Sequence, residues 1–176
     1  MIGGTGAVRA GSGGAPPASA TDAAEHGSGA GTASQDWPLV STLPPLAALP
    51  TAPACARGHV RAAARQWGLP DLADTAELVA SELVTNAVQA SERLTARANL
   101  AIVPVIRISL VSDQISMVIR VWDGNDETPV RHDADPDEIR GRGLMIIDSV
   151  AKDWGTYRTG DGKVVWAVIG GRQDGP

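Results

Sequence analysis

Two oxygen-bearing side chains, Glu82 and Asn86, stand four residues apart in the segment ELVTNAV. If this segment is helical, both side chains emerge on the same side of the helix. Asparagine is a poor residue for the middle of a helix, which favours a use in ligand binding. An amide oxygen suits Mg²⁺, which takes few protein ligands beside water and phosphate, and a neighbouring carboxylate can orient or deprotonate an attacking hydroxyl group or water. The alternative is that both residues are simply solvated on a helix surface.

A third candidate, Asp123, follows the apolar residues Val121 and Trp122. A carboxylate beside buried residues costs free energy unless it accepts hydrogen bonds. Two interpretations remain open. The run Asp123-Gly124-Asn125 has the composition of a turn; alternatively, the carboxylate accepts a hydrogen bond from an exocyclic amine such as that of adenine.

A Gly-Arg-Gly tripeptide occupies residues 141–143, directly before a stretch with apolar residues at helical spacing. Backbone N–H groups and the helix dipole attract anions at the first turn of a helix, and glycine lets a ligand approach the backbone closely. The stretch does not match the dinucleotide fingerprint, because Ile146 occupies the position of its third glycine. We therefore expect a helix terminus that binds an anion.

The elements that must position these side chains follow from hydrophobic periodicity. Apolar residues recur at steps of three and four in residues 71–91, which predicts a long helix capped by Asp71. Two hairpins are predicted where β-rich runs flank turn residues. The expected elements are an edge strand within residues 39–49, helices over 53–67 and 71–91, a hairpin over 103–122, a helix from 141, and a hairpin over 156–169.

Hairpins that cluster, rather than strands that alternate strictly with helices, predict an α+β fold. We expect a two-layer α/β sandwich in which helices cover one face of a mixed, mostly antiparallel sheet. Residues 124–141 interrupt this order with two prolines, six acidic residues and no periodicity. This length and composition predict a functional loop.

Composition bounds the rest of the chain. The 176 residues carry a net charge of −5, so we expect no direct contact with nucleic acid, which needs a basic face. Apolar runs stay shorter than the roughly 18 residues of a membrane span, and the single cysteine, Cys55, cannot form an internal disulfide, so we expect a cytoplasmic protein. Half of residues 1–36 are Gly or Ala, which predicts a disordered tail before one domain at residues 37–172.

Taken in order, the three candidate segments resemble the boxes of the GHKL, or Bergerat-fold, ATP-binding family of gyrase, heat-shock chaperones, histidine kinases and anti-sigma serine kinases. ELVTNAV resembles the N-box, Asp123 with Gly124 resembles the first glycine box, and GRGL at residues 141–144 resembles the second. Residues 162–166 lie where the last box closes the sheet. The resemblance covers residues 37–170, and the nearest branch is that of the small bacterial anti-sigma factors with serine-kinase activity.

This resemblance implies a histidine kinase-like ATPase fold that binds ATP and Mg²⁺. It implies that Asn86 binds the metal, that Glu82 is the catalytic general base, and that residues 124–141 form the lid over the nucleotide. Asp123 would recognise adenine, and the second glycine box would hold the phosphates. The residues that the resemblance assigns to cofactor binding are Asn86, Asp123, Gly124, Gly141, Arg142, Gly143 and Leu144.

Two positions depart from the family pattern. Gly124 directly follows Asp123, whereas the first glycine box is usually Asp-x-Gly-x-Gly. Val164 stands where the last box often carries a threonine that supports adenine recognition. Both departures lie in the part of the site that would bind adenine.

Two functions remain open. The first is an ATP- and Mg²⁺-dependent protein serine/threonine kinase of the anti-sigma type, a homodimer that binds a sigma factor and phosphorylates an anti-anti-sigma-like partner in regulating transcription. The second is a regulatory module that binds nucleotide, or a partner alone, without phosphotransfer, and the two departures favour it. A histidine-kinase fragment is disfavoured because no phosphoacceptor helix accompanies the domain.

Overall fold

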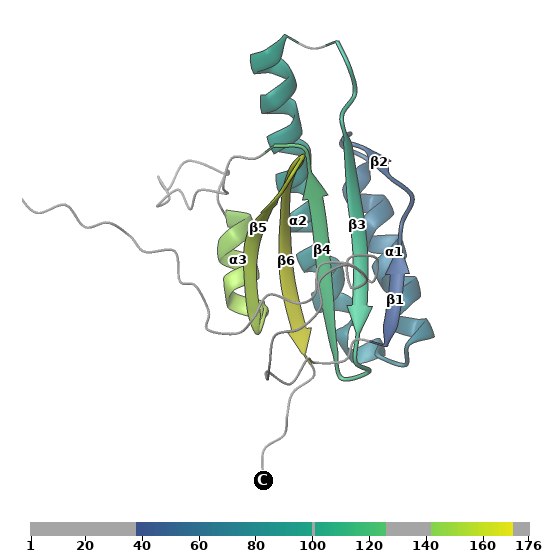
Figure 1. Cartoon of the computed structure of the whole chain (residues 1–176). Helices are drawn as coiled ribbons and strands as arrows, with labels where there is room; N and C mark the ends of the chain where they lie inside the picture. The colour runs from purple at the N-terminus through teal and green to yellow at the C-terminus, as the bar shows by residue number, and fades with distance from the viewer. Residues whose placement is uncertain (1–37, 100, 126–141, 171–176) are drawn as a thin grey trace, which may run out of the picture. The chain divides into compact units, whose positions relative to one another are not determined.

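The structure is a computed structural model that describes residues 38–99, 101–125 and 142–170. The predicted tail, both limits of the predicted domain and most of the predicted loop lie outside these residues. The elements, drawn in Figure 1, are β1 (Leu39–Thr42), β2 (Leu46–Ala47), α1 (Ala52–Gln66), the 3₁₀ turn η2 (Pro70–Leu72), α2 (Ala73–Ala98), β3 (Val105–Ser112), β4 (Ser116–Asp123), α3 (Arg142–Val150), β5 (Asp153–Thr159) and β6 (Gly162–Gly170).

The strands form one sheet in the order β1-β3-β4-β6-β5, with β2 also paired to β3. Every strand pairing among the described residues is antiparallel. The helices α1, α2 and α3 lie together on one side of this sheet (Figure 1). The α+β class and the two-layer sandwich with helices on one face are thereby confirmed.

The core lies between the sheet and α2. The apolar face predicted for this helix is buried, with Val79, Leu83 and Ala87 at most 3% exposed. On the sheet, successive side chains alternate between the two faces, and Ile108 and Ile119 of β3 and β4 pack into the same cluster as α2. Two independent periodicities, 3.6 on the helix and 2 on the strands, therefore meet in one hydrophobic layer.

Two details of α2 differ from expectation. The helix continues past residue 91 to Ala98, because the helix-favouring residues 92–98 prolong it after its apolar face has ended. It ends where Asn99 adopts a left-handed conformation with φ 48°. Asp71 is not its cap: this residue lies inside η2, which runs directly into α2 with no side-chain hydrogen bond at the junction. Among the helices of the described residues, none combines the length and hydropathy that crossing a membrane requires.

The central place of β4 predicts the effect of truncating its core side chain. Ile119→Ala, at a position that is 0% exposed, is expected to lower the free energy of unfolding by about 2–5 kcal/mol, because it leaves a cavity between sheet and helix. Ile115→Ala, in the turn before β4 at 61% exposure, is expected to change it by less than about 0.5 kcal/mol. Urea denaturation of the two variants measures the difference, and equal losses would contradict the position of the core.

Candidate functional site

The first cluster joins α2 to the start of α3. Glu82 and Asn86 are half-buried on α2, and Gly143 in the first turn of α3 lies against both. A β-carbon placed on Gly143 would lie 2.7 Å from Oε2 of Glu82 and 3.5 and 3.6 Å from Nδ2 and Oδ1 of Asn86. The structure therefore brings these three predicted residues together at one place.

The close approach at Gly143 explains why a glycine suits this position. A larger residue would displace the carboxylate of Glu82, whereas glycine leaves the backbone at the helix N-terminus beside the carboxylate and the amide. Leu144, also predicted to contact the cofactor, buries its side chain in the core cluster, so its side chain anchors α3. Gly141 lies outside the described residues, and for Arg142 the structure describes the backbone as the first residue of α3.

The second cluster lies at the end of β4. Asp123 is 1% exposed and pairs in register with Lys163 at the start of β6. The Lys163 ammonium group donates a hydrogen bond to Oδ1 of Asp123 at 2.8 Å, and the backbone N–H of Asn125 donates to the same oxygen at 3.0 Å. The predicted turn and a buried carboxylate with donors are thus both present in one short segment.

Asn125 connects this cluster to α2. Its backbone oxygen accepts a hydrogen bond from Nζ of Lys163 at 2.8 Å, and its side-chain Nδ2 donates to the backbone oxygen of Ala90 at 3.1 Å. Ala90 lies four residues beyond Asn86, which is about 6 Å along the helix axis. The two clusters are therefore neighbours on one helix.

Lys163 and Asn125 are the residues of this site that sequence reasoning missed. Val164 was expected at the place of the threonine that the last box often carries, and the strand register sets Val164 opposite Trp122 and Lys163 opposite Asp123. Because side chains alternate along a strand, Val164 points to the other face of the sheet. The available signal was a single lysine in an otherwise apolar strand, in a chain that has only one other lysine.

Gly124, the predicted glycine of the first box, is not required by its neighbours. A β-carbon there would meet Trp122 at 3.7 Å and Asp161 at 3.9 Å, which is ordinary van der Waals contact. Gly162 is different, because a β-carbon there would collide with the backbone oxygen of Asp123. Close approach of β6 to the end of β4 therefore depends on Gly162.

The electrostatics of Asp123 reflect two opposing effects. Burial raises the pKa of the Asp123 carboxyl above its ordinary value, since a charged group loses its hydration there. The hydrogen bond and charge of Lys163, the N–H of Asn125 and the charge of Arg93 lower this pKa and offset part of the rise. The ionised carboxylate depends mainly on its lysine partner.

Metal binding would rely on few protein ligands. Within the described part of the chain, no group of three or more His, Cys, Asp or Glu side chains could hold a metal ion. Asn86 offers one amide oxygen, which fits Mg²⁺ because this ion usually keeps waters and completes its shell with phosphate oxygens. The Asp123 carboxylate at the end of β4, the N-terminus of α3 and the side chains of Glu82 and Asn86 thus all lie beside or on α2.

A family model described as a histidine kinase-like ATPase domain matches residues 46–169. This range extends from β2 to β6 and contains both clusters. Among curated proteins, none matches the chain.

The close contact at Gly162 predicts a difference between the two glycines of the β5–β6 turn. Gly162→Ala is expected to lower the free energy of unfolding by about 1–3 kcal/mol, since the added carbon meets backbone that cannot move freely. Gly160→Ala, where a β-carbon has open space, is expected to change it by less than about 0.5 kcal/mol. Thermal and urea unfolding compare the pair; a tolerated Gly162→Ala would refute the packing of β6 against Asp123.

Proposed function

The chain belongs to the family of histidine kinase-like ATPase domains, an ATP-binding family, and on this basis we propose that the two clusters form its ATP site. Asp123 accepts a hydrogen bond from the adenine amine, and the backbone at the start of α3 binds the phosphates. Asn86 holds Mg²⁺, and Glu82 accepts the proton of the attacking group. Gly141 and Arg142 are assigned to the phosphate site as well, because they resemble the second glycine box.

One observation carries this proposal: the close approach of the backbone at Gly143 to Glu82 and Asn86. The first turn of α3 approaches Glu82 and Asn86 so closely that a β-carbon would lie 2.7 Å from the carboxylate. A helix N-terminus attracts phosphate. Beside it, the Asn86 amide would supply a ligand for a phosphate-bound cation, and the Glu82 carboxylate would serve as the general base. The metal, when bound, supplies charge stabilisation for the phosphates.

We propose further that the domain is a protein serine/threonine kinase of the anti-sigma type. In this reaction Glu82 accepts the proton of a seryl or threonyl hydroxyl group, whose oxygen attacks the γ-phosphorus of ATP while ADP leaves. The partners that this function implies are a sigma factor and an anti-anti-sigma-like protein, with the domain acting as a homodimer. The sequence ELVTNAV and the GRGL at the start of α3 support this branch.

A regulatory module that binds nucleotide without phosphotransfer is the second candidate. The two departures from the family pattern, at Gly124 and Val164, favour it. This module binds nucleotide, or a partner alone, and it differs from the kinase in that it transfers no phosphate. The two experiments below separate them.

Asn86→Ala is expected to abolish Mg²⁺-dependent ATP binding, because the variant loses the proposed metal ligand. Gly143→Ala is expected to weaken binding as well, since its β-carbon crowds the same two side chains. Gly58→Ala, on α1 where a β-carbon has open space, serves as the matched control and is expected to bind as the wild type does. Calorimetric titration with ATP in the presence and absence of Mg²⁺ measures all three. Unchanged affinity of Asn86→Ala would refute the metal site.

Glu82→Gln is expected to keep the affinity for Mg²⁺–ATP within about threefold and to lower the rate of phosphate transfer by about 10²–10⁴, because the amide cannot accept the proton. Release of ADP under single-turnover conditions, with water as the acceptor, measures the rate. An equal rate in variant and wild type would refute the role of Glu82 as the general base. A wild type that binds ATP but transfers phosphate neither to water nor to an added anti-anti-sigma-like protein would favour the module without phosphotransfer.

A further inference from the structure

The carboxylate of Asp123 uses its two oxygens unequally. Both of its hydrogen bonds within the described residues, from Lys163 and from the N–H of Asn125, fall on Oδ1. Oδ2 accepts none from these residues. The arrangement fixes the plane of the carboxylate, and among the described residues it leaves Oδ2 without a hydrogen-bond donor.

Lys163 holds the Asp123 carboxylate in this orientation. Its side chain is 5% exposed, and that of Asp123 is 2% exposed. Its ammonium group donates to Oδ1 of Asp123 and to the backbone oxygen of Asn125, both at 2.8 Å. A buried charge of this kind is tolerated when it is paired and hydrogen-bonded, and removal of one partner leaves the other uncompensated.

We infer that Lys163 is a positioning residue that sets the base specificity of the nucleotide site: it holds Oδ1 of Asp123 and keeps the carboxylate charged, so that Oδ2 can accept a hydrogen bond but cannot donate one. The inference rests on the ATP site proposed above. An ionised Oδ2 binds a purine with an amine at position 6 and repels the carbonyl oxygen of a 6-oxopurine. A protonated carboxyl could instead donate to that carbonyl, so the charge state decides which base is accepted.

The groups around Asp123 determine how far its charge depends on Lys163. From β6 the ammonium of Lys163 acts at hydrogen-bond distance, and from α2 the charge of Arg93 adds a weaker attraction. Asn125 contributes an uncharged donor. Burial pushes the pKa of the Asp123 carboxyl upward, so loss of Lys163 would raise this pKa further toward neutrality.

Base selectivity measured against pH tests the inference. Dissociation constants for ATP and for inosine triphosphate, which has a carbonyl in place of the amine and the same phosphates, are measured with Mg²⁺ at pH 6 and pH 8. The wild type is expected to prefer ATP by about tenfold or more at both pH values, as a charged hydrogen-bond acceptor facing an amine predicts. Lys163→Met is expected to lose several-fold of this preference, and more of it at pH 6 than at pH 8.

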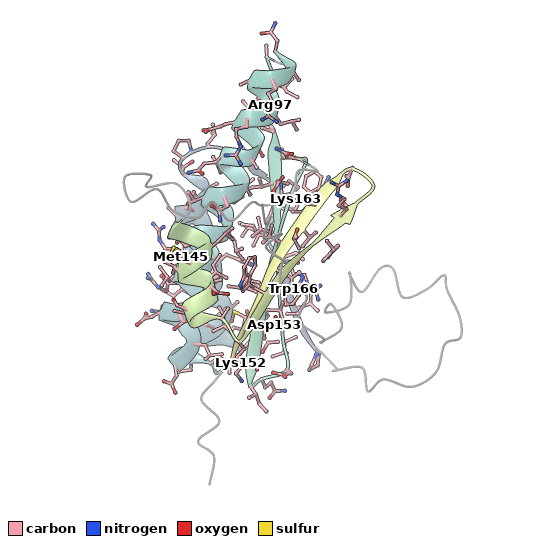
Figure 2. All side chains as sticks on the ribbon, turned by 90° about the vertical axis from the view of Figure 1, so that its left-hand side faces the viewer. Arg97, Met145, Lys152, Asp153, Lys163 and Trp166 are labelled. Atoms are coloured by element: carbon pink, nitrogen blue, oxygen red, sulfur yellow. The ribbon has the colours of Figure 1, made fainter. Side chains whose placement is uncertain are left out.

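The matched control is the chain's other lysine. Figure 2 shows Lys163 and Lys152 toward opposite ends of the molecule, with Lys163 on the side of Arg97. Lys152 is exposed, and Lys152→Met is expected to keep the wild-type preference at both pH values. If Lys163→Met weakens both nucleotides equally, or keeps the wild-type ratio, the inference is overturned and the lysine is structural.

Two further measurements separate this inference from the proposed function. Failure of the wild type to bind ATP, or Asp123→Asn binding both nucleotides as the wild type does, would overturn the ATP site itself. The carbon-13 chemical shift of the Asp123 carboxyl in the wild type needs no variant to fold. It is expected to report an ionised group at pH 7, and a protonated group there would refute the role of Lys163 directly.

Discussion

The buried ion pair between Asp123 and Lys163 is the interaction on which the rest of the site depends. Neither charge would be stable at 1% and 4% exposure without the other, since each has lost its hydration. The pair exists because β4 and β6 are antiparallel neighbours in a register that sets the two residues opposite each other. Gly162 permits the close approach of the strands, and Asn125 extends the hydrogen-bonded connection to α2.

The helix α2 serves as a common support for both halves of the site. One side of it is buried on the sheet through Val79, Leu83 and Ala87. At the border of this side it presents Glu82 and Asn86 to the start of α3, and one turn later its backbone accepts the Asn125 side chain. The two clusters are therefore held beside one helix, at a separation set by helical geometry, and this helix is anchored by the core.

The chain belongs to the histidine kinase-like ATPase family, which binds ATP, and α2 lies within the residues that match the family. In the structure Lys163 lies opposite Asp123, and Val164, which stands at the place of the last-box threonine, lies opposite Trp122. Lys163 makes the Asp123 carboxylate half of an ion pair, and both hydrogen bonds that the carboxylate accepts from the described residues fall on Oδ1.

The sequence by itself determined what depends on local pattern: the α+β class, the shared side of Glu82 and Asn86, the hairpins, and the glycine in the first turn of α3. It placed the end of α2 too early because an apolar stripe reports burial, whereas residues 92–98 are helical without being buried in full. The tertiary structure alone decided which residue faces Asp123. These positions are 40 residues apart, and a shift of one residue in strand register would exchange Lys163 for Val164. Register follows from the packing of the whole sheet, so no local pattern reveals it.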